Sequence, residues 1–145
     1  MIIKVFKVVW FVSLLVIMGV FVYCYAAWPQ MVSFSEQEGA IRFDKGILFY
    51  SGLGLIGLFN ALVFIVTRMR FSEAFVTWFY GLISTFHLFL ISGFIFITIF
   101  NSQEKYNYSM VGPSLYGSII IVLLWSAAWP IYILYTRFFT QAKLS

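Results

Sequence analysis

The chain has 145 residues, of which 63% are hydrophobic and 10% are charged, and its formal net charge is +4. A soluble domain carries about 25% charged residues, so this composition excludes a soluble globular protein. Lipid is the solvent that such a chain requires, and the bilayer is therefore its first expected partner. The length predicts one domain, residues 1–145.

Four long apolar runs follow one another along the chain. Each has the roughly 20 residues that a helix needs to cross ~30 Å of hydrocarbon. They predict helices over residues 5–28, 46–68, 73–100 and 112–138. Strands are excluded as the spanning element because the runs are continuously apolar and do not alternate. The predicted fold is all-α, an integral membrane four-helix bundle with no soluble domain.

The connections between the runs carry the local stop and start signals. Pro29 ends the first helix, because the residue before a proline avoids the helical conformation. The first run is longer than the roughly 7–15 residue core of a signal peptide, so we expect it to remain as a helix. Ser72 is the expected N-cap of the third helix, with Glu73 in its first turn.

The basic residues predict the orientation in the membrane. One side, formed by the N-terminus, the second connection and the tail, holds six cations: Lys4, Lys7, Arg68, Arg70, Arg137 and Lys143. The other side holds three: Arg42, Lys45 and Lys105. By the positive-inside rule, we expect a multi-pass protein of the inner (cytoplasmic) membrane with both termini in the cytoplasm. This scattered placement is not a phosphate-binding face, so no nucleic-acid partner is expected.

Small and aromatic residues predict how the helices pack. Trp10, Trp28, Trp78 and Trp129 lie near the ends of the runs, where tryptophan prefers the headgroup level. On the second helix Ser51, Gly54, Gly57 and Ala61 share one side, which predicts close helix packing. Gly52, Gly54 and Gly57 also match the dinucleotide fingerprint, but they lack the βαβ context that the fingerprint needs. Pro130 predicts a bend in the fourth helix near Ser126.

The third run contains the single histidine, His87. An ionisable group inside a membrane span is a functional-site hypothesis by default. Thr77, Tyr80, Gly81, Ser84, His87 and Ile91 recur at spacings of three and four, and so share one face. Counted from the cytoplasmic helix ends at ~1.5 Å per residue, His87 is level with Gly19, residues 54–57 and residues 125–126.

Three interpretations of His87 stay open. In the first, a neutral imidazole bonds to Ser84, Ser126 or Asn60 and holds helices together; Asn60 itself is interpreted as a cross-helix hydrogen-bonding residue. In the second, it contacts a partner protein, a lipid or a quinone headgroup. In the third, it ligates haem, with Met18 or a second subunit supplying the other axial ligand.

The sequence lacks the residues that a proton relay or a metal site would need. No carboxylate lies inside any run, and Cys24 and His87 are each the only residue of their type. A proton relay needs a chain of ionisable groups, and a metal site needs three or four ligands. We therefore expect no catalytic residue, no metal site and no resident cofactor.

One stretch resembles a known family. Trp28-Pro29, Val32, Gly39 and Lys45, followed by an apolar helix that opens with Phe49-Tyr50, are similar to the outer loop of SdpI-like small bacterial membrane proteins of the immunity type. The resemblance implies a bacterial integral membrane protein with an ordered outer loop.

The expected function is that of a non-catalytic accessory subunit of a larger bacterial inner-membrane complex, with other integral membrane subunits as partners. The chain carries no reaction chemistry of its own, which favours this interpretation. A haem- or quinone-associated electron-transfer subunit using His87 is one alternative. A stand-alone immunity-type membrane protein is the other.

Overall fold

The computed structural model describes residues 1–35, 41–102 and 111–141, with side chains up to Phe138. This part of the chain holds four helices: α1 (Ile2–Ala27), α2 (Lys45–Arg68), α3 (Glu73–Phe100) and α4 (Gly112–Gln141). All four are long and apolar enough to cross a membrane. The predicted all-helical class is confirmed, and each helix end lies within three residues of its expected place. Gly39, Lys105 and Lys143, on which some predictions rest, lie outside the described residues.

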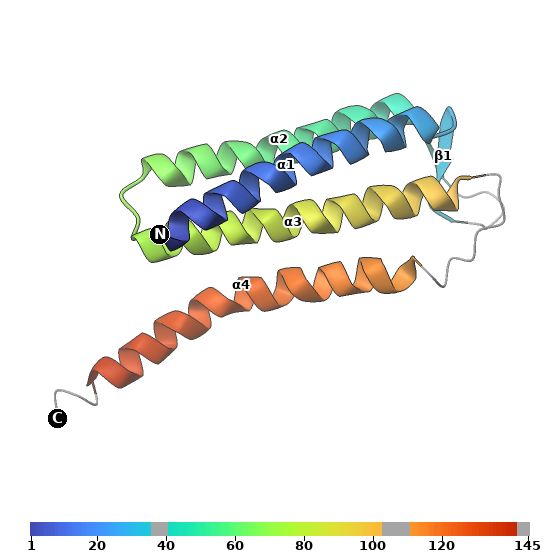
Figure 1. Cartoon of the computed structure of the whole chain (residues 1–145). Coiled ribbons are helices and arrows are strands. Elements are labelled where there is room, and N and C mark those ends of the chain that lie inside the picture. Colours follow the sequence, from blue (N-terminus) through green and yellow to red (C-terminus); the bar gives the residue numbers. More distant parts are fainter. Residues whose placement is uncertain (36–40, 103–110, 142–145) are drawn as a thin grey trace.

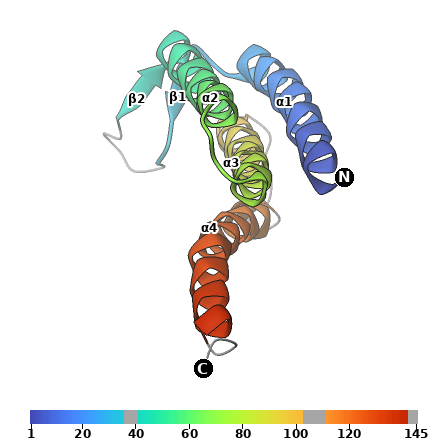
Figure 2. The ribbon, with the colours of Figure 1, turned by 90° about the vertical axis from the view of Figure 1, so that its left-hand side faces the viewer.

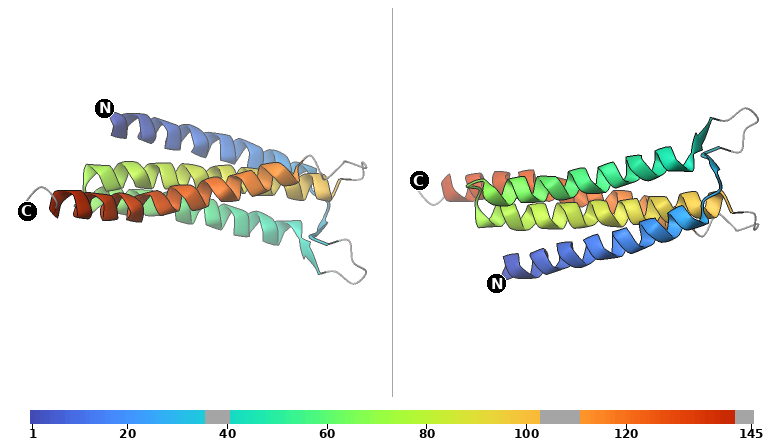
Figure 3. Two further views of the ribbon diagram at one scale, coloured as in Figure 1. Left: turned by 90° about the horizontal axis from the view of Figure 1, so that it is seen from below. Right: turned by 90° about the horizontal axis from the view of Figure 1, so that it is seen from above.

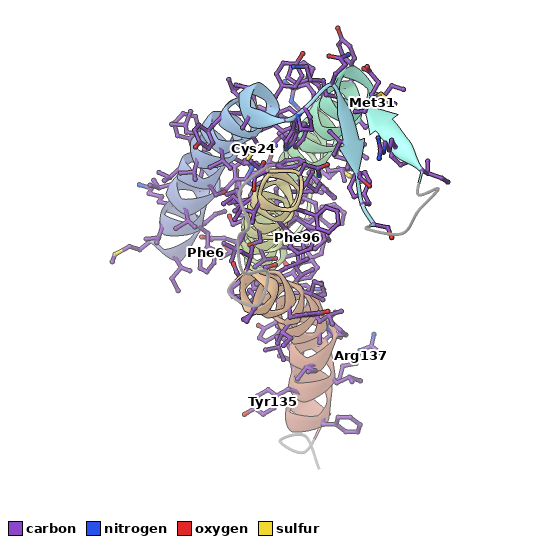
Figure 4. The ribbon with its side chains drawn as sticks, turned by 90° about the vertical axis from the view of Figure 1, so that its right-hand side faces the viewer. Phe6, Cys24, Met31, Phe96, Tyr135 and Arg137 are labelled. Atoms are coloured by element: carbon purple, nitrogen blue, oxygen red, sulfur yellow. The ribbon has the colours of Figure 1, made fainter. Side chains whose placement is uncertain are left out.

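Helix α3 is the central element of the bundle. Figure 2 shows α1 and α2 on one side of α3 and α4 on the other. The most extensive helix contact is between α1 and α3, followed by the contact between α3 and α4. The far part of α4, where Figure 4 labels Tyr135 and Arg137, stands away from the other helices. Helix α4 bends along its length, as Pro130 inside it predicts (Figure 1).

Two clusters of buried side chains join α1, α2 and α3. The first is centred on Ile17, Phe21, Cys24 and Phe94 and continues to Trp28. The second contains Trp10, Val63, Tyr80 and Ile83. Both clusters use the side of α3 that faces α1 and α2, so α4 contributes to neither core.

The two ends of the bundle differ. The start of α1 and the end of α4 lie at one end, and a small hairpin lies at the other (Figure 3). The hairpin pairs β1 (Met31–Ser33) with β2 (Arg42–Asp44) in antiparallel register, with Val32 opposite Phe43. These short strands were not predicted, because the sequence analysis considered strands only as spanning elements and excluded them in that role. At the end where α1 begins, Ser72 caps α3 as predicted, and its side chain accepts a hydrogen bond from Phe75 N.

Asn101 fastens the hairpin to the end of α3. Its Oδ1 accepts from Ser33 N at 2.8 Å, and its Nδ2 donates to Ser33 O at 2.9 Å. Trp28 adds a bond from Nε1 to Thr98 Oγ1 at 2.8 Å. At the start of α2, Asp44 accepts from Gly46 N and from Gln30 Nε2. The first connection is therefore held at both of its described ends.

Replacing Asn101 with leucine is expected to release the hairpin from α3. The change removes both hydrogen bonds to the hairpin, each worth about 1 kcal/mol, and a third bond to Ile97 O within α3. Amide exchange in β1 and β2 should therefore accelerate about tenfold or more, measured by hydrogen–deuterium exchange mass spectrometry. Asn101→Asp is the control, because it keeps the acceptor for Ser33 N and should give a smaller change. Equal protection in Asn101→Leu and the unmodified chain would contradict this role.

Candidate functional site

His87 lies near the middle of α3 and is fully buried, with 0% of its surface exposed. Its Nδ1 is 2.8 Å from Ser13 Oγ on α1. Its Nε2 is 3.2 Å from Asn60 Nδ2 on α2. The imidazole therefore connects the three helices that form the core.

Asn60 and Trp10 extend this network. Trp10 Nε1 donates to Asn60 Oδ1 at 2.9 Å, and Asn60 Nδ2 also donates to Ile56 O at 2.7 Å. Ser13 Oγ donates to Trp10 O at 2.8 Å. We call Trp10, Ser13, Asn60 and His87 the central polar network.

The donors and acceptors of the central polar network determine the state of the imidazole. An indole N–H can only donate, so the Asn60 atom that faces Trp10 is the carbonyl oxygen. The amide nitrogen then has two hydrogens, one for Ile56 O and one for His87 Nε2. Because Nε2 accepts, it carries no proton, and the proton of the neutral ring sits on Nδ1.

The network closes at Ser13. His87 Nδ1–H donates to Ser13 Oγ, and the Ser13 hydroxyl hydrogen is used on Trp10 O. Among the described residues no buried side-chain nitrogen or oxygen lacks a hydrogen-bond partner. In a membrane interior such completeness matters, because an unpaired polar group there costs several kcal/mol.

The sequence named three candidate partners for His87, and the structure brings one of them, Asn60, to the ring. Ser84 instead donates to Tyr80 O on its own helix at 2.9 Å. Ser126 lies on α4, on the other side of α3 from Asn60. Both ring nitrogens are engaged, so a haem iron or a quinone oxygen would have to displace Ser13 or Asn60.

Trp10 and Ser13 are the members of the network that the sequence did not reveal. Trp10 was assigned to the headgroup belt, but it is only 7% exposed and bonds to Asn60 in the core. Trp28 is likewise packed inside the protein, being 3% exposed and bonded to Thr98. The available signal was chemical: an indole N–H and a carboxamide, each inside an apolar run, need partners.

A second constellation joins α3 to α4. Trp78 Nε1 donates to Trp125 O at 2.8 Å, and Trp125 Nε1 donates to Trp78 O at 2.9 Å. The Trp125 ring lies over Gly81, where a Cβ atom would come within 2.6 Å of Trp125 Cε2. Close approach at Gly81 thus allows this reciprocal tryptophan pair to form.

The small residues of α2 have two different environments. Gly52 is buried, and a Cβ atom there would come within 2.7 Å of the Phe21 ring. Gly54, Gly57 and Ala61 are exposed, and nothing lies within 4 Å of a Cβ built on either glycine. We call Ser51, Gly54, Gly57 and Ala61 the outer small-residue face, and all four residues are exposed in the described part of the chain.

No described residues form a metal site, since no three His, Cys, Asp or Glu side chains come together in this part of the chain. Cys24 is buried in the α1–α3 core. Pro130 lies on α4 and is exposed.

Comparison with known proteins found no matching family model, curated protein or solved structure.

Proposed function

We propose that this protein is a non-catalytic accessory subunit of a larger bacterial inner-membrane complex. It would be a multi-pass protein with both termini in the cytoplasm, and other integral membrane subunits would be its partners. The side chains of the central polar network bond to one another across three helices, which supports a role in structure and assembly.

The outer small-residue face is the observation that carries this proposal. Ile56, Asn60 and Val63 of α2 pack into the core, whereas nothing lies within 4 Å of a Cβ atom built on Gly54 or Gly57. Glycine in a helix interior costs about 1 kcal/mol relative to alanine. Small residues favour association in lipid because they let a second helix approach closely. A partner helix on this face would offset the cost of two exposed glycines.

Enlarging the outer small-residue face is expected to release the partner. In the double variant Gly54→Leu/Gly57→Leu, two leucine side chains would hold a second helix away from α2. Co-purification of other membrane chains in mild detergent should fall at least tenfold, as measured by quantitative mass spectrometry. The variant should keep the fold, and its melting temperature should be no lower than that of the unmodified chain, because neither position touches the core and leucine is the better helix former.

Gly19→Leu is the matched control. Gly19 on α1 is also exposed, with nothing within 4 Å of an added Cβ atom, but it lies outside this face. A protein that runs alone under every gentle condition would contradict the subunit proposal. That outcome would favour the alternative of a stand-alone immunity-type membrane protein.

A further inference from the structure

A pocket of about 670 Å³ opens between α1, α3 and α4 at the end of the bundle where α1 begins. Five aromatic side chains line it: Phe6, Trp78, Trp125, Trp129 and Tyr132. Ring centroids of Trp78 and Trp129, and of Trp129 and Tyr132, are 5.6 Å apart, and those of Phe6 and Trp125 are 5.7 Å apart. Phe6 reaches this side of α1 in the end-on view of Figure 4.

Glu73 is the one charged residue in the lining of this pocket. Its side chain is exposed, and no Lys or Arg of the described chain forms an ion pair with it. Thr77, one turn along α3, lines the same pocket and adds a hydroxyl that can accept a hydrogen bond. The pocket thus combines aromatic faces with an unneutralised carboxylate, the two groups that attract a cation in a partly dry site.

The position of the pocket identifies the kind of cation. Glu73 is the first residue of a membrane-spanning helix, so the pocket lies at the depth of the lipid headgroups. Farther along the crease between α1 and α3 lies an apolar groove of about 390 Å³. Its lining includes Val8, Val12, Val16 and Leu88, which suit an acyl chain.

We propose that this pocket binds the ammonium headgroup of a phosphatidylethanolamine molecule whose acyl chain follows the α1–α3 groove. The ammonium group donates hydrogen bonds to the Glu73 carboxylate and lies against the aromatic rings. An anionic headgroup such as phosphatidylglycerol is repelled by the same carboxylate. The site is therefore selective for headgroup charge.

Native mass spectrometry of the purified full chain tests the site. The probes are phosphatidylethanolamine and phosphatidylglycerol with identical acyl chains, added at equal concentration. The unmodified chain should retain the ethanolamine lipid about fivefold more than the glycerol lipid, because the Glu73 carboxylate attracts the ammonium group and repels the anionic headgroup. Glu73→Gln should abolish the preference, whereas Glu73→Asp, which keeps the charge, should retain most of it.

Trp129→Leu should also abolish the preference, and Tyr50→Ala, at an exposed aromatic position on α2, should leave it unchanged. Because Glu73 is exposed, Glu73→Gln gives a result even if the tryptophan variant fails to fold. Equal retention of both lipids by the unmodified chain would overturn the proposal. So would a preference that survives Glu73→Gln. Partner co-purification is a separate measurement, and its failure would leave this result unaffected.

Discussion

Replacing Asn60 with leucine is expected to lower the free energy of unfolding by about 2–3 kcal/mol. Asn60 makes three hydrogen bonds, with Trp10, Ile56 and His87. Hydrogen bonds between membrane helices average ~0.6 kcal/mol, with a maximum near 1.7. The variant also leaves the Trp10 indole and His87 Nε2 buried without partners, and each orphaned group adds about 1 kcal/mol or more.

The measurement is reversible unfolding in bicelles, with a double-mutant cycle. Trp10→Phe removes the indole N–H, so Asn60→Leu in that background should be less damaging by about 1 kcal/mol. Ser51→Leu, a change from polar to leucine on the exposed side of the same helix, should alter stability by less than about 0.5 kcal/mol. Strict additivity of Trp10→Phe and Asn60→Leu would show that the two side chains act independently.

Gly81→Ala should destabilise the protein by about 1–3 kcal/mol, although alanine is the better helix former. The added methyl group would press on the Trp125 ring, and overpacking of this kind has costs of that size. A larger residue should do more: Gly81→Leu is expected to push Trp125 out and break both reciprocal bonds with Trp78. Because α4 packs mainly against α3, it would then separate from the bundle.

Gly93→Ala on the same helix is the matched control, since nothing lies within 4 Å of its added Cβ atom. It should stabilise the protein by up to about 1 kcal/mol, so the two alanine variants should differ in sign. Spin labels on α3 and α4 would report the separation in Gly81→Leu as a longer and broader distance distribution. Unchanged distances would mean that α4 is held by contacts elsewhere.

The helices were predictable because a membrane span leaves a long, simple signal. Residues 73–100 were predicted and found as one helix, bounded by the Ser72 cap and by Asn101. Three-residue strands leave no comparable pattern, because alternation cannot be recognised over such a length. The hairpin depends instead on Asn101, a residue 68 positions from its partner Ser33.

The site was predictable in kind but not in detail. His87 and Asn60 were identified as polar groups that need partners inside lipid, and they bond to each other. Ser13 was missed because depth was counted as if all helices began level, which placed His87 opposite Gly19. The helices are staggered and tilted, so helix lengths alone do not determine which residues meet (Figure 1). The residues that were predicted to share one face of α3 also contact different helices. Gly81 lies against α4, whereas His87 bonds to α1 and α2.

The pairing of α1 with α3 imposes an order on synthesis. Ser13 and His87 are separated by 74 residues, so at ~5–20 residues per second Ser13 is synthesised roughly 4–15 s before His87. During that interval Ser13 can still donate to Trp10 O within α1, whereas the Trp10 indole lacks its partner Asn60. The central polar network is therefore completed only after α3 has been synthesised.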